Sequence, residues 1–583
     1  MKQKLSAFII LVSAFFMVSH KSMADDVSSS LAGKVTDMDT HAPLVGVTVY
    51  IPDLKTGSVS DAGGSFKIGH LPSGQFIVEV RLLGYKTIAQ QVAIKGNTVF
   101  NFELSASSIE QNEVVVTGLS KATEINRSPV PIIAINKQYI QQNLHTNIID
   151  AISGVPGVSA VTTGPNISKP FIHGLGYNRV LTLYDGMRQE GQQWGDEHGI
   201  EVDQYGIDRV EVVEGPASLT YGSDALAGVV NLIPTPPAPD GKIIGNVLGE
   251  YQTNNGMIGS SAMLSGNSNG FYWLGRISHK QAKNYRNKMD GWVYGTNYNE
   301  TDATASFGLN RGWGYSHLDL TLFDDLQAIP DGSRDSATGQ FTKQITEADT
   351  ARPIVPYGEL NTYQLPVQHQ HVQLYRVHSS SNFILGNGNL NLGLGFERSI
   401  RREFSHPEAA TTPGLFLQLN TYTYDVKYYL PELNGWSLSL GVNGMYQANT
   451  VTNGTEFVIP SYHQFDAGPF LMARKSIGKL DLAGGVRYDL RVFHNSGLYI
   501  RPNPKTGFDE PVYGADTVGA DHPYSDFQHS FSGASGSIGA TYNFTDKLAL
   551  KFNIARGYRA PNISEISANG VHPGTGIYQI GNP

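Results

Sequence analysis

The sequence contains no cysteine. This absence excludes disulfide frameworks, thiolate metal sites, cysteine nucleophiles and a lipid-modified N-terminal cysteine. The chain also lacks an excess of positive charge, because 42 Lys and Arg stand against 51 Asp and Glu, for a formal net charge of −9. Since nucleic-acid binding usually leaves a basic footprint, we expect no nucleic acid among the partners.

Long apolar runs are also absent. Ala7 to Val18 is an apolar run of about twelve residues, whereas a spanning helix needs about twenty. It follows the basic "MKQK" and precedes "SMA" at Ser22 to Ala24, which is typical of a secretory signal peptide covering residues 1–24. An exported chain without apolar helices can enter a membrane only as a β-barrel.

Motifs of common catalytic sites are missing too. The sequence has no Gly-x-Ser-x-Gly elbow, no phosphate-binding loop and no His-Glu-x-x-His. These motifs carry nucleophilic, phosphate and zinc-hydrolase chemistry. We therefore expect that the protein is not an enzyme and requires no cofactor.

What the chain does contain is β-forming sequence. It has 583 residues, with 64 Gly, 29 Tyr and 25 Phe, so several domains or one very large sheet are needed. Residues 30–105 alternate short strands with turns and predict a β-sandwich. Residues 119–234 mix strands with short helices and predict a compact α+β domain. The proline-rich "IPTPPAPDG" then joins it to residues 241–583.

The last region has a period of two. In "LDLAGGVRYDLRV", Val486, Tyr488 and Leu490 fall on one face, and Arg487 and Asp489 fall on the other. A soluble sandwich also alternates. Strands of about ten residues with aromatic ends and long polar connections, behind a signal peptide, favour a transmembrane antiparallel β-barrel with a polar lumen.

One short stretch, "NEVVVTG" at 112–118, combines high strand propensity with no partner in the sequence, since no Asn-Gly type turn and second alternating run follow it. With "PFIHGLGYNRVLTLYDGMR" and "IDRVEVVEGPASLTYGSDALAGVVNLI", it resembles a TonB-dependent outer-membrane receptor. Residues 30–105 are similar to a carboxypeptidase regulatory-like domain, through "GKVTD", "PLVGVTVYI" and "SDAGGSFKI".

The resemblance implies a location in the outer membrane and active transport that is driven through TonB and its inner-membrane energising complex. It implies that residues 112–118 are the TonB box, which pairs with TonB by strand addition. The residues that would bind TonB are Glu113, Val114, Val115, Val116, Thr117 and Gly118. The alternative is a short strand that extends the preceding sandwich.

The resemblance also makes residues 119–234 a plug inside the barrel. Four charged residues match positions that such plugs use against the barrel wall: Arg179, Arg209, Glu211 and Glu214. Alternatively, they only solubilise the plug. Receptors of this kind close with an even number of strands, and we find about thirteen plausible strands after Gly241, so we expect the barrel to be truncated, with C-terminal strands missing after Pro583.

The ligand is predicted from "RQEGQQWGDEHGIEVDQ" at 188–204, which by resemblance is the apex of the plug. Its excess of carboxylates should repel an anionic ferric siderophore and attract a cation. Carboxylates with a neutral imidazole suit zinc or another divalent transition metal. The candidate ligands are Asp196, Glu197, His198 and His173, with His369 and His371 from "QHQHVQLYRVH" as a further pair.

Alternatives remain for each part of this prediction. The acidic segment can be a solvated loop, and the paired histidines can be polar residues that face the lumen. A siderophore or haem receptor is the alternative ligand class, and a passive porin or adhesin is the alternative of a different class. The expected partners are therefore TonB, outer-membrane lipid and a metal ion or metal chelate.

Overall fold

The computed structural model describes residues 28–107, 114–115, 123–195, 198–215, 219–545, 548–572 and 577–582. The predicted signal peptide, residues 1–24, lies outside these ranges. Among the described residues, no helix has the length and apolar character needed to cross a membrane.

The N-terminal domain is a sandwich of two four-stranded sheets. One sheet has the order β3-β2-β5-β6, and in the other β1 pairs with β4, β7 and β8. Leu31, Val49 and Val78 are fully buried between them. The strands are β1 (Ser29–Asp37), β2 (Thr48–Ile51), β3 (Thr56–Val59), β4 (Ser65–Leu71), β5 (Gly74–Arg81), β6 (Ile88–Ile94), β7 (Asn97–Val99) and β8 (Phe102–Leu104), with the 3₁₀ turn η1 (Pro52–Leu54) after β2.

The next domain has the predicted α+β composition. Its five-stranded sheet has the order β11-β16-β17-β14-β15, and Asn136 and Asn147 cap the N-termini of two short helices. The elements are β9 (Val114–Val115), β10 (Thr123–Glu124), η2 (Ile125–Arg127), β11 (Ile132–Asn136), α2 (Lys137–Gln142), α3 (Ile148–Ile152), β12 (Val158–Gly164), β13 (Ile167–Ile172), η3 (Tyr177–Arg179), β14 (Val180–Tyr184), β15 (Met187–Arg188), η4 (Gln204–Gly206), β16 (Ile207–Glu214) and β17 (Gly228–Pro234).

Thirteen strands then form one antiparallel sheet in sequence order, with β18 and β35 as its edges in the described chain. This agrees with the predicted number of about thirteen strands. They are β18 (Ile243–Gln252), β19 (Met257–Ser268), β20 (Phe271–Ala282), β23 (Tyr298–Arg311), β24 (Gly314–Ala328), β25 (His369–Leu385), β26 (Gly388–Phe404), β27 (Leu415–Tyr429), β28 (Trp436–Thr450), β29 (Tyr462–Ile477), β30 (Leu480–Asn495), β34 (Phe527–Thr545) and β35 (Leu548–Arg556).

The connections between these strands carry small elements of their own. They are β21 (Arg286–Asn287), β22 (Gly291–Trp292), α4 (Tyr357–Leu360), β31 (Leu498–Pro502), β32 (Asp509–Val512), η5 (Gly514–Thr517) and β33 (Asp521–Tyr524), and the chain continues after β35 with α5 (Ile563–Ser567), β36 (Asn569–His572) and β37 (Ile577–Ile580).

The predicted alternation of the barrel strands is confirmed. In β30, Val486 and Tyr488 are 61% and 53% exposed, whereas Arg487 and Asp489 are 5% and 6% exposed. Because successive side chains of a strand point to opposite faces, the sheet has an apolar outer face and a polar inner face. The inner face contacts the α+β domain, since Arg487 donates to the carbonyl of Leu219.

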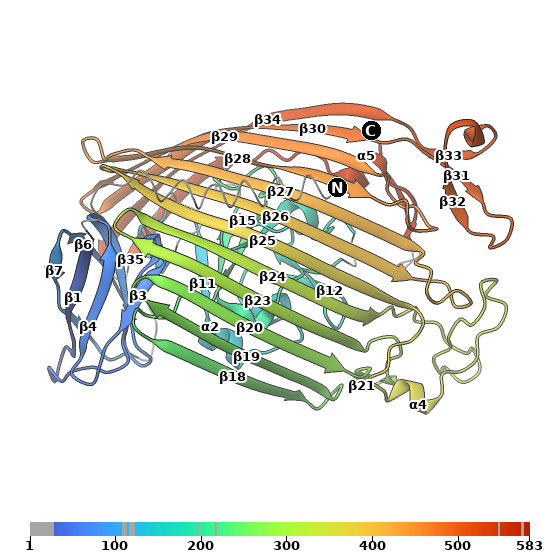
Figure 1. The fold of residues 1–583 in the computed structure, drawn as a ribbon, viewed down its shortest axis with the longest axis horizontal. Coiled ribbons are helices and arrows are strands. Elements are labelled where there is room, and N and C mark those ends of the chain that lie inside the picture. The colour runs from blue at the N-terminus through green and yellow to red at the C-terminus, as the bar shows by residue number, and fades with distance from the viewer. Residues whose placement is uncertain are drawn as a thin grey trace.

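The sandwich and the long loops lie at opposite ends of the barrel. In Figure 1 the blue sandwich is at the left, beside short turns such as 386–387, and the long connections with α4 and β31 to β33 extend to the right. We call these the short-turn end and the long-loop end. The Asn310 amide, near the short-turn end, donates to the carbonyl of Leu54 in the sandwich at 2.8 Å.

Candidate functional site

The segment between β15 and η4, described at residues 189–195 and 198–203, contacts the barrel at the end of β28 that leads into a long connection. We call it the apex. The side chain of Gln192 donates to Asn449, the penultimate residue of β28, at 3.1 Å. The backbone N–H of Glu190 donates to Glu397 of β26 at 2.8 Å. The apex is therefore held against two strands of the barrel wall.

His198 is the imidazole of this segment, and its ring is fully buried. Its Nδ1 lies 2.5 Å from the carbonyl oxygen of Gln192. Because a carbonyl only accepts hydrogen bonds, a neutral ring carries its proton on Nδ1 and keeps the lone pair on Nε2. That Nε2 faces Glu403 of β26, with 3.8 Å between Nε2 and Oε1.

This spacing is close to that of two ligands of one metal ion. Two atoms that bind a tetrahedral zinc ion at about 2.1 Å are roughly 3.4 Å apart. The carbonyl that holds Nδ1 also plays the part of the hydrogen-bond acceptor that orients most metal-binding histidines. His198 and Glu403 therefore present a nitrogen and an oxygen donor to one point.

The backbone around His198 is shaped to place the ring. A Cβ on Gly195 would lie 2.7 Å from the His198 ring, so a larger residue there would displace it. The buried ammonium group of Lys169 donates to the carbonyl of Gln193 at 2.6 Å and also contacts the carbonyl of Gly195. The indole of Trp194 packs edge-on against the imidazole, with ring centroids 5.0 Å apart.

The other described carboxylates of the apex, at residues 190, 201 and 203, are compensated by neighbouring groups. Glu201 lies 3.5 Å from Arg401 of β26, and Glu190 forms an ion pair with Arg188. Asp203 accepts from Ser278 at 2.8 Å. Burial raises the pKa of Glu201 to about 8, against the opposing effect of Arg401. The apex is thus less negative than its sequence indicates.

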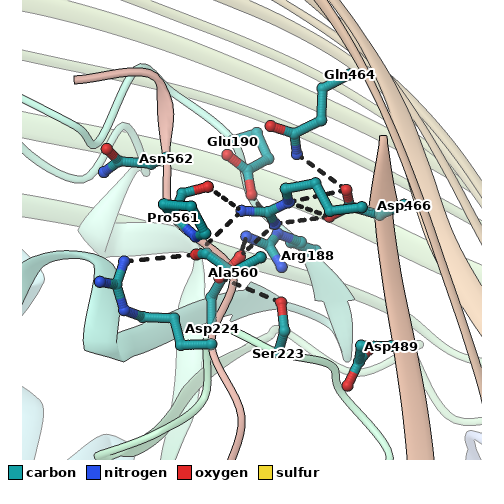
Figure 2. A network of polar contacts seen from close by, with 12 residues as sticks. Arg188, Glu190, Ser223, Asp224, Gln464, Asp466, Asp489, Ala560, Pro561 and Asn562 are labelled. Carbon is teal, nitrogen blue, oxygen red and sulfur yellow. Dashed lines mark hydrogen bonds and ion pairs between the residues drawn. The ribbon is translucent and has the colours of Figure 1, made fainter. Parts of the chain in front are cut away.

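A network of ion pairs fastens the same segment to the barrel (Figure 2). Arg188 contacts Asp224, and Arg491 of β30 lies 3.0 Å from Asp224 and 2.6 Å from Asp466 of β29. Arg491 also donates to the carbonyl of Pro561 at 3.2 Å. Burial alone would raise the pKa of Asp224, but the guanidinium groups of Arg491 and Arg188 outweigh it and lower the pKa.

Family models match three successive parts of the chain. Residues 235–583 match the TonB dependent receptor-like β-barrel, residues 124–229 match the TonB-dependent receptor plug domain, and residues 31–116 match the CarboxypepD_reg-like domain. The chain belongs to the TonB-dependent receptor family. The resemblance read from the sequence is confirmed, and so is the outer-membrane location that it implies.

Individual relatives match a smaller part of the receptor. An iron-regulated outer membrane virulence protein of Vibrio cholerae is 37% identical over 127 residues, 21% of this chain and 19% of the relative. The vitamin B12 transporter BtuB of Vibrio vulnificus is 33% identical over 138 residues, 23% of this chain and 22% of the relative. The chain thus spans about a fifth of these curated relatives.

A solved structure shares the fold of the receptor. The FrpB iron transporter of Neisseria meningitidis superposes with a TM-score of 0.57 at 14% identity, over 75% of this chain and 66% of that chain. This level of identity supports the plug-and-barrel architecture alone.

The predicted TonB box is partly described. Glu113, Val116, Thr117 and Gly118 lie outside the described residues, but Val114 and Val115 form β9, which pairs antiparallel with β10. Val115 is buried among apolar plug residues. The expectation that these valines lack a strand partner is therefore wrong, because a partner only eight residues further on is close enough to form a two-stranded ribbon. The role in TonB binding remains a prediction.

Three of the four charged residues expected to meet the barrel wall form ion pairs elsewhere. Arg209 pairs with Glu211 at 3.1 Å on the same strand and approaches Glu79 of the sandwich at 3.9 Å. Glu214 pairs with His173 at 3.2 Å within the plug. The role of these three residues against the barrel wall remains a prediction.

Arg179, the fourth residue, acts electrostatically on Glu565 of α5, which follows β35. Its role against the barrel wall remains a prediction.

The predicted metal ligands are not all brought together. Asp196 and Glu197 lie outside the described residues. Gly199 packs against Ile167 at the start of β13, and His173 follows the end of that strand, about 20 Å away along the strand. His173 therefore does not join His198.

His369 and His371 face away from the lumen. Their neighbours in β25, Gln370 and Val372, are buried. Gln370 contacts Arg401, which faces the lumen. His369 stacks on Phe404 with ring centroids 4.7 Å apart, and His371 lies 3.1 Å from Asp324. The shared face predicted from their spacing exists, but it is the outer one.

Sequence reasoning missed the barrel partners of the apex. Glu403 and Arg401 on the inner face of β26 meet His198 and Glu201, and Arg491 on the inner face of β30 meets Asp224. The alternation of "FERSIRREF" at 396–404 indicates which residues face the lumen. It does not indicate which plug residue each one meets.

Proposed function

We propose that the receptor carries out TonB-dependent active transport of a divalent transition metal ion, or a complex of one, across the outer membrane. The ion is bound first at the apex by His198 and Glu403, with Asp196 and Glu197 as further ligands. TonB then acts on the box at 112–118 and remodels the plug so that the ion passes to the periplasm.

The observation that carries the proposal is the orientation of His198. A buried imidazole with Nδ1 held by the carbonyl of Gln192 directs its Nε2 lone pair at a carboxylate 3.8 Å away. An anionic siderophore would meet Glu403 and would gain little from a neutral ring. The names of two relatives, an iron transporter and an iron-regulated protein, support a metal-containing cargo without selecting one.

The test is calorimetry on the full chain purified in detergent, with zinc, copper and a panel of ferric siderophores. We expect tight binding of a divalent ion, weakened at least a hundredfold by His198→Ala and by Glu403→Gln. The double variant His369→Ala, His371→Ala is the matched control, since these histidines face outward, and it should bind within about twofold of the wild type. Tight siderophore binding that is unaffected by alanine at residues 196, 197 and 198 would overturn the metal-ion proposal.

A second measurement separates transport from passive permeation. Deleting residues 113–118 should abolish energised uptake of the ion in cells while leaving its binding to the purified receptor unchanged, because the box contains none of the proposed ligands. Unchanged uptake after this deletion would favour a passive pore.

A further inference from the structure

A second group of charged side chains surrounds a cavity of about 230 Å³ near the short-turn end. All three domains contribute to its lining: Lys55 from the sandwich, Asp185 from the plug, and Asp319 and His378 from the barrel. It is distinct from the apex, which lies against the long-loop halves of β26 and β28. We call Asp185, Asp319 and His378 the exit cluster.

The exit cluster has the donors of a metal site. One ligand atom from each of its side chains lies within 4.8 Å of the others. Asp319 on β24 and His378 on β25 are directly opposite each other in the sheet, and Asp185 reaches them from the turn after β14. Two ligands of one tetrahedral zinc ion are roughly 3.4 Å apart, so binding requires the side chains to close by up to about 1.4 Å.

His378 points to a missing ligand. Its side chain is buried, with 2% of the residue exposed, and neither ring nitrogen has a hydrogen-bond partner in the described part of the chain. A buried imidazole without partners loses its hydrogen bonds to water and gains nothing in return. A metal ion held with the two adjacent carboxylates would satisfy one of these nitrogens.

A cation already occupies part of the cluster. The Lys55 ammonium lies 2.5 Å from Asp185, 3.5 Å from the hydroxyl of Ser380 and 5.7 Å from the ring centroid of Tyr315. Lys55 sits at the end of η1, between β2 and β3 of the sandwich. Its charge is thus carried into the barrel by a separate domain.

We propose that the exit cluster is a second binding site for a divalent transition metal ion, for which the ion and Lys55 compete. Two carboxylates and one imidazole leave a position open for water, a set that suits zinc and its neighbours. A bound dication replaces the ammonium at Asp185 and so breaks the ion pair between sandwich and plug. The sandwich then loosens at the short-turn end when an ion arrives. This site does not depend on the one at the apex.

The test uses the full chain in detergent with cobalt(II) alone, followed by its visible absorption and by calorimetry. It is done in the His198→Ala background, which removes the apex site. We expect one remaining binding event, weakened at least tenfold by His378→Gln. Lys55→Met should strengthen it at least tenfold, while Lys55→Arg, which keeps the competing charge, should not.

The matched control is His317→Gln. His317 is buried on the inner face of β24, lines the same cavity and bonds to Asn310 at 3.1 Å, so its loss should leave cobalt binding within twofold. If His378→Gln does not fold, Asp185→Asn takes its place and should weaken cobalt binding in the same way. Asn tolerates the left-handed backbone at this position, where φ is 51°.

Three results would overturn the proposal: no binding in the His198→Ala background, residual binding that both cluster variants leave unchanged, or weaker binding in Lys55→Met. The first of these would leave the apex proposal intact. Conversely, full-affinity binding in His198→Ala that disappears with His378→Gln would support the exit cluster and contradict the apex.

Discussion

The apex and the exit cluster use the same kinds of side chain and differ in how their charge is balanced. At the apex and directly beside it, carboxylates meet arginines that project from barrel strands, as Glu201 does with Arg401 and Asp224 does with Arg491. At the exit cluster, Asp185 meets a lysine from the sandwich. An arginine makes several directed hydrogen bonds, whereas a lysine is a single mobile charge. The comparison suggests that one end is built to hold the plug and the other to release it.

The largest expected effect tests this difference directly. Arg491→Met leaves Asp224 and Asp466 facing each other inside the lumen without their shared cation. Removing one partner of a buried ion pair destabilises by about 3 to 5 kcal/mol. Lys55→Met should cost about 1 kcal/mol or less, as is typical of one partly exposed pair. The measurement is the free energy of plug release in a urea titration followed by tryptophan fluorescence.

Lys343→Met is the control for that titration, because the Lys343–Glu359 pair lies in a long loop and is partly exposed on both sides. It should leave the free energy unchanged. Equal losses in Arg491→Met and Lys55→Met would remove the contrast between the two ends.

An intermediate effect is expected from Gly195→Ala. The added Cβ would sit 2.7 Å from the His198 ring and would rotate it away from Glu403. We expect metal affinity at the apex to fall about tenfold, or roughly 1.4 kcal/mol, with no change at the exit cluster. Gly249→Ala on β18 is the control, since its Cβ would meet no atom within 4 Å. Calorimetry in which both glycine variants behave alike would show that the ring position does not govern affinity.

The smallest effect concerns pH. Because burial raises the pKa of Glu201 to about 8, the folded protein holds a proton there that the unfolded chain releases above about pH 4.5. The folded state therefore binds more protons between these values, and stability falls as the pH rises through this window. Between pH 6 and 7 the loss is at most about 1.4 kcal/mol.

Glu201→Gln removes this titration, so the variant should match the wild type at about pH 4.5, where both side chains are neutral. Its unfolding midpoint should then exceed that of the wild type by a margin that grows up to about pH 8 and levels off above it. A difference that stays constant from pH 5 to pH 9 would show that Glu201 is ionised throughout. Midpoints measured by differential scanning calorimetry in detergent would decide.

Most of the architecture could be predicted from the sequence, because it depends on local patterns. The period of two in "LDLAGGVRYDLRV" indicated which face of β30 is apolar, and the turn chemistry of residues 30–105 indicated a sandwich. Family resemblance of the plug segments supplied their place inside the barrel. Each of these inferences concerns neighbours along the chain.

The site was harder to predict because it depends on neighbours in space. The spacing of His369 and His371 correctly indicates that both side chains lie on one face of a strand. Two residues do not indicate whether that face points to the lumen or to the lipid. The alternation of polar and apolar residues along the whole strand is needed for that assignment. The acidic apex was interpreted without Arg401, which lies 200 positions further along the chain than Glu201. His378 ends the same stretch, "QHQHVQLYRVH", but it lies seven residues from His371 and therefore on the opposite face of the strand, so the spacing predicts no shared site.

The pairing of β9 with β10 has a consequence for energy transduction. A segment that is folded against its own chain can be captured by TonB only in the fraction of molecules where it has been released, and the apparent affinity falls by that fraction. If Val115 leaves the core in one molecule in a thousand, a micromolar interaction is measured as roughly millimolar. Any cargo that loosens the ribbon raises this fraction. If the predicted box is the segment that TonB binds, the resting receptor would ignore TonB and the loaded one would recruit it, with no change in the box itself.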